Sequence, residues 1–267
     1  MLLLLPPSEG KTAPASGAAL DLETLALAEH DDVTAARRDM LAALREVSQR
    51  DDALTLLGVG ASLADEVTAN THLETAPAAP GHRVFTGVLF EALDYASLTA
   101  AQRAKAREQV LVFSALFGAT RLGDRLPAHR LSIGAKLPGF PGLAAWWKPT
   151  LTPALDALAA DGQPIVDCRS GGYAAQWKPP ASQTVTVDVF QLRGGERTVV
   201  SHFAKYTRGL VARALLQAPS RSVRTLAGVE KVVSAAGSPA GPYDWTVQVR
   251  PPHGTKPGSL QVILPEA

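Results

Sequence analysis

The sequence predicts a single α/β (α+β) domain over residues 1–267, built on a mixed β-sheet flanked by helices. Short apolar runs typical of buried strands alternate along the chain with segments of helical periodicity. No repeat, low-complexity linker or shift in composition marks a domain boundary. With 267 residues, 46% of them hydrophobic, the chain is long enough to bury one sizeable core.

The N-terminal half opens with an apolar run, Leu2 to Leu5, which Pro6 and Pro7 end. A strand without a polar face must be covered on both sides, so we expect it inside the sheet. A helix is predicted over about 33–49, and two short helical segments within residues 51–69. Further helices are expected at about 88–95 and, capped by Ser97, around 103–107.

The C-terminal half repeats the alternation. Residues 110–113 and 165–168 are predicted as buried strands, with a helix of about 146–160 between them that prolines interrupt. Polar and apolar residues alternate with period two over 184–190. A turn at Gly194-Gly195 leads from this segment to residues 198–202, which predicts a β-hairpin. A helix beginning at about residue 203 follows, and the last strands are expected at 244–250 and 260–264.

Composition excludes several classes of protein. The net charge is +1, so a nucleic-acid role must rest on a local basic patch. Cys168 is the single cysteine and no stretch supplies a signal peptide or a membrane span, which predicts a cytoplasmic protein without membrane association. The six histidines are scattered and no nucleotide-cofactor fingerprint is present, so we expect neither metal nor cofactor.

Four predicted strands break into polar loops, after Leu5, Phe113, Asp167 and His202. If these strand ends share one edge of the sheet, the loops surround a positively charged cleft suited to phosphate, carboxylate or a nucleic-acid backbone. The alternative is a solvated surface whose cations pair with nearby carboxylates. The side chains brought by these loops are Ser8, Glu9, Lys11, Ser114, Arg121, Arg130, Arg169, Tyr173, Lys178, Lys205 and Arg208, and Arg213 is expected on the same side of the last helix.

A turn of sequence Gly58-Val59-Gly60 lies between the two short helical segments of residues 51–69. Such a segment is like a helix-hairpin-helix element, in which glycines let the backbone approach a phosphate. The acidic residues Asp65 and Glu66 lie close by in the sequence. A plain turn between two packed helices is the alternative interpretation.

The opening stretch, residues 3–12, resembles the start of the YaaA family of bacterial peroxide-stress proteins. Four later stretches resemble the same family in the same order, and together they span nearly the whole chain: Phe85 to Gly87, Ser114 to Gly118 with Arg121 to Gly134, Tyr173 to Pro179, and Ala204 to Gly209. The resemblance implies a mixed α/β fold with a positively charged cleft and a helix-hairpin-helix element. It also implies binding to duplex DNA and a role in limiting oxidative damage through intracellular iron.

Two functions follow as hypotheses, and an interaction protein with dispersed surface charge is a third. The first is a DNA-binding protein of the peroxide-stress response, whose phosphate contacts would come from Ser8, Lys11, Gly58, Gly60, Arg121, Arg130, Lys136, Lys178, Lys205 and Arg208. The second is an enzyme acting on a small anionic substrate such as a nucleotide. In that case Glu9 or Tyr173 would transfer protons, and Lys205 with Arg208 would clamp the anion. The sequence does not give the oligomeric state.

Overall fold

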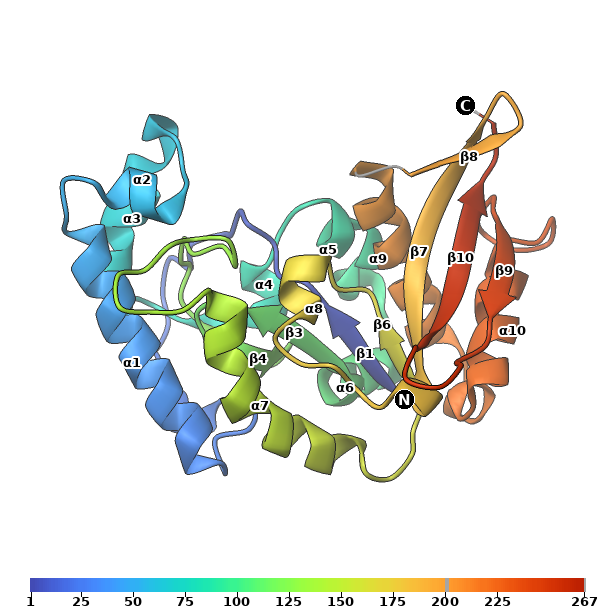
Figure 1. The fold of residues 1–267 in the computed structure, drawn as a ribbon, viewed down its shortest axis with the longest axis horizontal. Coiled ribbons are helices and arrows are strands. Elements are labelled where there is room, and N and C mark those ends of the chain that lie inside the picture. The colour runs from blue at the N-terminus through green and yellow to red at the C-terminus, as the bar shows by residue number, and fades with distance from the viewer. Residues whose placement is uncertain (200–201, 267) are drawn as a thin grey trace.

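The centre of the molecule is the strand β1 (Leu2–Leu5), all four of whose side chains are buried. The computed structural model describes residues 1–199 and 202–266 of the chain (Figure 1). β1 pairs in parallel with β3 (Val110–Ser114) on one side and with β6 (Ile165–Asp167) on the other. β6 in turn pairs in parallel with β7 (Thr184–Arg193). The carboxyl ends of β1, β3 and β6 therefore lie along one edge of the sheet, as the sequence predicts.

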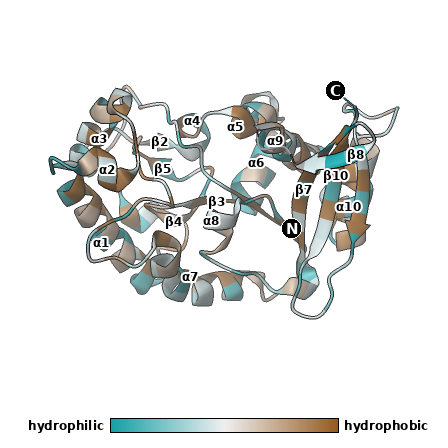
Figure 2. Ribbon diagram, turned by 45° about the horizontal axis from the view of Figure 1, so that its top comes forward, coloured by the Kyte–Doolittle hydropathy of each residue, from teal (hydrophilic) through white to brown (hydrophobic). Residues whose placement is uncertain are grey.

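Antiparallel strands complete the sheet, so the predicted mixed sheet is confirmed. Its order is β4-β3-β1-β6-β7-β10-β9, with β8 paired to β7. β4 (Gly118–Arg121) runs antiparallel to β3, and β8 (Glu196–Val199) antiparallel to β7. β10 (Gly258–Leu264) is parallel to β7 and antiparallel to β9 (Thr246–Arg250). Hydrophobic residues are concentrated along the strands and on the helix faces packed against them (Figure 2).

The β7–β8 hairpin turns at Gly194 and Gly195, whose φ angles are 59° and 78°. Two successive residues with positive φ are typical of the tight turn that matches the twist of antiparallel strands, and only glycine adopts this conformation without strain. The predicted hairpin is confirmed up to β8. The part of the prediction that covers residues 200–201 lies outside the described residues.

Helices flank the sheet on both sides. α9 packs against β7 and α5, and α10 packs against α9 and β9, while α7 lies against β4 and α1 against α7. No described helix is long and apolar enough to cross a bilayer. The helices, with the small sheet of β2 and β5, are α1 (Asp31–Ser48), α2 (Ala53–Leu57), α3 (Ala64–Ala69), β2 (Ala79–Pro80), α4 (Gly81–Val84), α5 (Val88–Leu93), α6 (Ala100–Gln109), β5 (Arg125–Leu126), α7 (Leu143–Ala159), α8 (Gly171–Ala174), α9 (His202–Gln217) and α10 (Leu226–Ala236).

Two local predictions differ from the structure. The predicted cap Ser97 is wrong, because Thr99 caps α6 through a reciprocal pair of hydrogen bonds with Gln102. This capping box satisfies two backbone N–H groups at once, which a lone serine further upstream cannot do. α7 also starts earlier than expected and continues through both of its internal prolines. Burial of Trp147, whose indole N–H donates to the carbonyl of Ala115 at 2.7 Å, anchors the helix there.

α5 and α9 approach each other closely at Gly209. A Cβ atom on this residue would lie 2.2 Å from the carbonyl oxygen of Leu89 and 2.7 Å from the Cβ of Ala92. Real Cβ atoms are not found so close to backbone, so any larger side chain would force the two helices apart. The glycine therefore sets the distance between the helix that begins with Val88 and the helix that carries Lys205 and Arg208.

We expect Gly209→Ala to lower the free energy of unfolding by about 1 to 3 kcal/mol, because the added methyl group overlaps the α5 backbone. Alanine is the better helix former by about 1 kcal/mol, so a net loss of stability identifies the overlap. The matched control is Gly171→Ala, whose Cβ would meet nothing within 4 Å. Urea unfolding of both variants tests the expectation, and a Gly209→Ala variant as stable as the control would contradict it.

Candidate functional site

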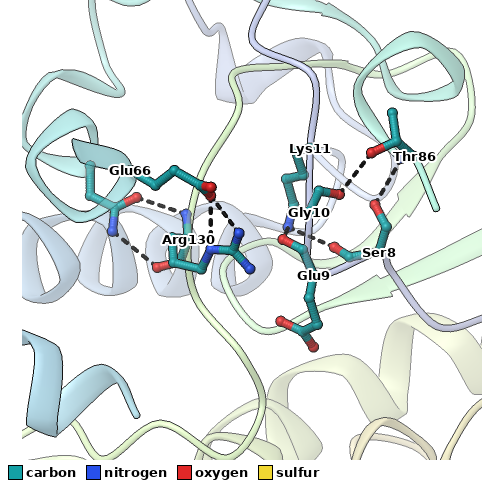
Figure 3. A network of polar contacts seen from close by, with 8 residues as sticks. Ser8, Glu9, Gly10, Lys11, Glu66, Thr86 and Arg130 are labelled. Carbon is teal, nitrogen blue, oxygen red and sulfur yellow. Dashed lines mark hydrogen bonds and ion pairs between the residues drawn. The ribbon is translucent and has the colours of Figure 1, made fainter. Parts of the chain in front are cut away.

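The loop after β1 is held from two directions. The backbone N–H of Thr86 donates to Ser8 Oγ at 2.9 Å, and Thr86 Oγ1 donates to the carbonyl of Gly10 at 3.2 Å. From within the loop, Lys11 Nζ donates to the carbonyls of Ser8 at 2.8 Å and Glu9 at 3.3 Å (Figure 3). These bonds satisfy the polar backbone of a loop that leaves the sheet beside buried strands. The position of Glu9 is thereby fixed.

A pocket of about 180 Å³ lies next to this loop. Its walls come from four segments: the loop after β1, the start of α5, the residues after β6 and the first turns of α9. The polar side chains that line it are Ser8, Glu9, Thr86, Ser170, Tyr173, Lys205 and Arg208, and the apolar ones include Pro6, Pro7, Val88, Leu89 and Phe90. We call it the Glu9 pocket. The structure thus brings together five of the predicted site residues: Ser8, Glu9, Tyr173, Lys205 and Arg208.

A buried tyrosine and a carboxylate meet in the Glu9 pocket. Tyr173 is only 4% exposed, and its hydroxyl donates to Glu9 Oε1 at 3.1 Å. Burial raises the pKa of Tyr173 far above its ordinary value, and both the charge of Glu9 and the hydrogen bond to it raise that pKa further. The phenol therefore remains protonated and acts as a donor, while Glu9 Oε2 has no partner among the described residues.

Two cations face the Glu9 pocket from α9. Arg208 donates through Nε to the carbonyl of Val187 at 3.0 Å, and its terminal nitrogens have no partner in the described part of the chain. Lys205 is exposed and is likewise without a hydrogen-bonded or ionic partner there. The predicted third cation, Arg213, is directed elsewhere. It binds the carbonyls of Leu93 and Asp94 at 3.1 Å, so it anchors the end of α5 instead.

A second group of charges lies on the other side of the loop, where Lys11 faces Arg130 (Figure 3). Arg130 is bound to Glu66 of α3 through Nε at 2.9 Å, and its backbone N–H donates to Asn70 Oδ1 at 2.9 Å. The pKa of Lys11 is lowered to about 8, chiefly by burial and to a smaller extent by the charge of Arg130, whereas the charges of Glu9 and Glu66 oppose the shift. Lys11, Glu66 and the buried His129 line a pocket of about 330 Å³.

The segment of residues 51–69, which we call the glycine hairpin, consists of α2, a turn at Gly58 to Gly60, a short 3-10 helix and α3. Gly58 ends α2 with a φ of 67°, the left-handed conformation that favours glycine at this position, whereas Gly60 has an ordinary φ of −81°. Lys136 lies beside the hairpin because its backbone N–H donates to the carbonyl of Leu56 at 2.9 Å. Its side chain is exposed and unpaired within the described residues.

The remaining predicted residues lie outside the Glu9 pocket. Arg121 is opposite Leu111 near the start of β3, so it occupies the far edge of the sheet, where it donates to the carbonyl of Glu108. The expectation that it joins the other cations is wrong, because β4 runs antiparallel to β3 and returns the chain. Lys178 is exposed beyond α8, next to a separate pocket of about 360 Å³.

Two further loop residues have structural roles. Ser114 is buried, and its hydroxyl accepts from the backbone N–H groups of Leu116 and Phe117 within its own turn. Arg169 is buried in an ion pair with Asp167, with Nη2 at 2.7 Å from Oδ2, and it stacks on Phe113 at 4.1 Å. Neither side chain is available to a ligand.

Cys168 is fully buried, and burial raises its pKa to about 12. A thiol reacts with oxidants as the thiolate, so this cysteine is unsuited to react with peroxide. Its predicted role in packing is confirmed. No group of three His, Cys, Asp or Glu side chains with metal-binding geometry occurs among residues 1–199 and 202–266.

Sequence reasoning missed the tie between the glycine hairpin and the loop around residue 130. In the sequence, Glu66 is only an acidic residue near the glycine turn, yet in the structure it neutralises Arg130, which is 64 positions away. Asn70 completes the tie by accepting from the backbone N–H of Arg130 and donating to its carbonyl. No local pattern signals a pairing at this separation. Thr86, which fixes Ser8, has no signal in the sequence beyond its place in the stretch Phe85 to Gly87.

Comparison with known proteins identifies the family of this chain. The sequence model of the family described as peroxide stress protein YaaA matches residues 1–232. The chain belongs to the YaaA family. A UPF0246 protein of Streptomyces coelicolor is 42% identical over 260 residues, which cover 93% of this chain and 98% of that protein. A UPF0246 protein of Corynebacterium efficiens is 42% identical over 241 residues, covering 89% of this chain and 93% of the relative.

The match to the YaaA family includes every residue of the Glu9 pocket and of the glycine hairpin. The resemblance stated from the sequence is thereby confirmed at the level of the family. Residues 233–267, which contain β9 and β10, lie beyond the matched range. These two strands extend the sheet on the side away from β1.

The low pKa of Lys11 predicts a pH dependence of stability. Between pH 8 and 10.5 the unfolded chain binds more protons at Lys11 than the folded chain, so the free energy of unfolding should rise with pH. The difference between the pKa values of Lys11 in the unfolded and folded chain corresponds to a gain in the free energy of unfolding of about 3 kcal/mol at most. Urea unfolding across this range, with Lys11→Met as the reference, measures the contribution. A difference between the two proteins that stays constant or shrinks as pH rises would contradict it.

Proposed function

We propose that the chain is a DNA-binding protein of the peroxide-stress response that contacts the phosphate backbone of a duplex. The observation that carries the proposal is the position of Lys136, an exposed and unpaired lysine held against the glycine hairpin by its backbone. The hairpin alone offers acidic side chains and no lysine or arginine. A cation supplied from a remote segment gives it the charge that a phosphate contact requires.

The acidic residues beside the hairpin oppose phosphate binding less than the sequence alone suggests. Glu66 is engaged by Arg130, which offsets one of the two negative charges beside the turn. Gly58 and Gly60 are exposed, and a Cβ atom on either would meet nothing within 4 Å, so the backbone of the turn is open to a ligand. Lys178, Lys205 and Arg208 would supply further phosphate contacts along the edge of the sheet where β1 and β6 end.

The proposal predicts DNA affinity that falls steeply with salt, because each neutralised phosphate releases counterions. Replacing Lys136 with alanine should lower the slope of log K against log salt by about 1 without changing sequence preference. Arg208→Ala should weaken binding in the same way. The matched control is Lys231→Ala, an exposed lysine on α10, which lies at the end of the molecule away from the hairpin (Figure 1).

Gel-shift titrations of a duplex over a series of salt concentrations measure these slopes. A DNA affinity that changes neither with salt concentration nor in the Arg208→Ala variant would count against the proposal. An equal effect of Lys136→Ala and Lys231→Ala would assign the binding to general surface charge instead of to the hairpin.

A second function is favoured by the Glu9 pocket, which at about 180 Å³ is far too small for a duplex. An enzyme acting on a small anion would use Lys205 and Arg208 to hold the charge and the Glu9–Tyr173 pair to transfer a proton. The pocket lies at the carboxyl ends of parallel strands, where ligand sites of α/β proteins are commonly found. The protonated Tyr173 would serve as the acid.

Turnover assays with a panel of phosphorylated and carboxylated metabolites test this second function. Tyr173→Phe should lower the rate of any reaction found by about 10² to 10⁴, while duplex binding and folding stay unchanged. Clear DNA binding together with no hit in the panel would remove the enzyme from consideration.

A further inference from the structure

The Glu9 pocket has the size of a site for a small ligand. Its volume of about 180 Å³ corresponds to roughly six waters, and pockets for drug-sized ligands are larger, at about 300–1,000 Å³. The pocket opens to the surface, because Glu9, Ser170 and Lys205 are exposed. A larger molecule could therefore insert one end while the rest of it stays outside.

The two cations of the pocket favour a phosphate group carrying two charges. The terminal nitrogens of Arg208 have no partner in the described part of the chain, and their fork geometry matches two oxygens of one phosphate. Lys205, one turn earlier on α9, adds a second positive charge. A phosphomonoester offers more charge and more free oxygens than a diester within a chain, so it uses this pair more fully.

Glu9 limits what else the ligand contains. A carboxylate in the same small pocket repels a bare phosphate, so a favourable ligand must present a hydrogen-bond donor to it. Glu9 Oε1 accepts from Tyr173, which leaves Oε2 for a hydroxyl group of the ligand. Ser8 Oγ accepts from the backbone of Thr86, so its own hydroxyl hydrogen is free to donate to a ligand oxygen.

We infer that the Glu9 pocket binds a sugar phosphate, that is, a phosphomonoester on a small carbon skeleton with hydroxyl groups. Lys205 and Arg208 hold the phosphate, and Glu9 accepts from a sugar hydroxyl. The inference rests on the second function proposed above. It shares Lys205 and Arg208 with the proposed duplex contacts, but its test uses small ligands and needs no duplex. The same chemistry is offered by a free sugar phosphate and by the phosphorylated 5′ end of a DNA strand.

Calorimetric titration of the full chain with ribose 5-phosphate, inorganic phosphate and ribose tests the inference. Ribose 5-phosphate should bind at least about tenfold more tightly than either fragment, and Lys205→Ala or Arg208→Ala should each weaken it about tenfold or more. Lys205 is exposed, so its replacement leaves the fold intact. Lys231→Ala is the control and should bind all three probes as the wild type does.

Glu9→Gln separates the two halves of the site. Glutamine retains an acceptor for Tyr173 but removes the negative charge, so inorganic phosphate should bind more tightly than to the wild type. The preference for ribose 5-phosphate over inorganic phosphate should fall, because the hydroxyl loses its charged acceptor. An unchanged preference in this variant would overturn the role assigned to Glu9.

A further arm compares DNA with a 5′-phosphate against the same DNA with a 5′-hydroxyl. A preference for the phosphorylated end that Lys205→Ala abolishes identifies a strand end as the ligand, whereas binding of ribose 5-phosphate alone identifies the free sugar phosphate. Ribose 5-phosphate that binds no better than inorganic phosphate overturns the inference but leaves the anion pocket. Binding of no phosphomonoester overturns the anion pocket too, and neither result affects the gel-shift test of duplex binding.

Discussion

The rest of the structure depends on the parallel pairing of β1 with strands on both of its sides. Because β1 consists of four leucines, it is stable only where both of its faces are buried, and its backbone N–H and C=O groups are then paired with β3 and β6 at its two edges. This requirement places the N-terminus of the chain in the middle of the sheet. The loop that follows must then leave the sheet at the edge where β3 and β6 also end, between segments distant in sequence.

The loop after β1 separates two charged regions, since the side chains of Glu9 and Lys11, two residues apart, leave it in different directions. Glu9 points into the small pocket beside Tyr173, whereas Lys11 faces Arg130 and the pocket next to α3 (Figure 3). The hydrogen bonds of Lys11 to the loop's own carbonyls join the two sides. A phosphate-backbone surface around the hairpin and a small-ligand pocket can therefore occur in one molecule, with the N-terminal loop as their common wall.

Much of the fold could be predicted from the sequence, because it depends on local patterns. The run Leu2 to Leu5, the period-two alternation of β7 and the Gly194-Gly195 turn each determine an element through nearby residues. Parallel order also explains why the polar residues after β1 and β6 meet. The pairing of Arg130 with Glu66 and the displacement of Arg121 to the far edge could not be predicted, since both depend on how distant segments pack.

The contact between α5 and α9 at Gly209 has a consequence for how the Glu9 pocket behaves. Both helices line that pocket, and at Gly209 they pack so closely that the carbonyl of Leu89 leaves no room for a side chain between them. The close contact at Gly209 resists any closer approach of the two helices. A ligand would meet a preorganised wall on this side of the pocket, so little ordering entropy would be lost on association.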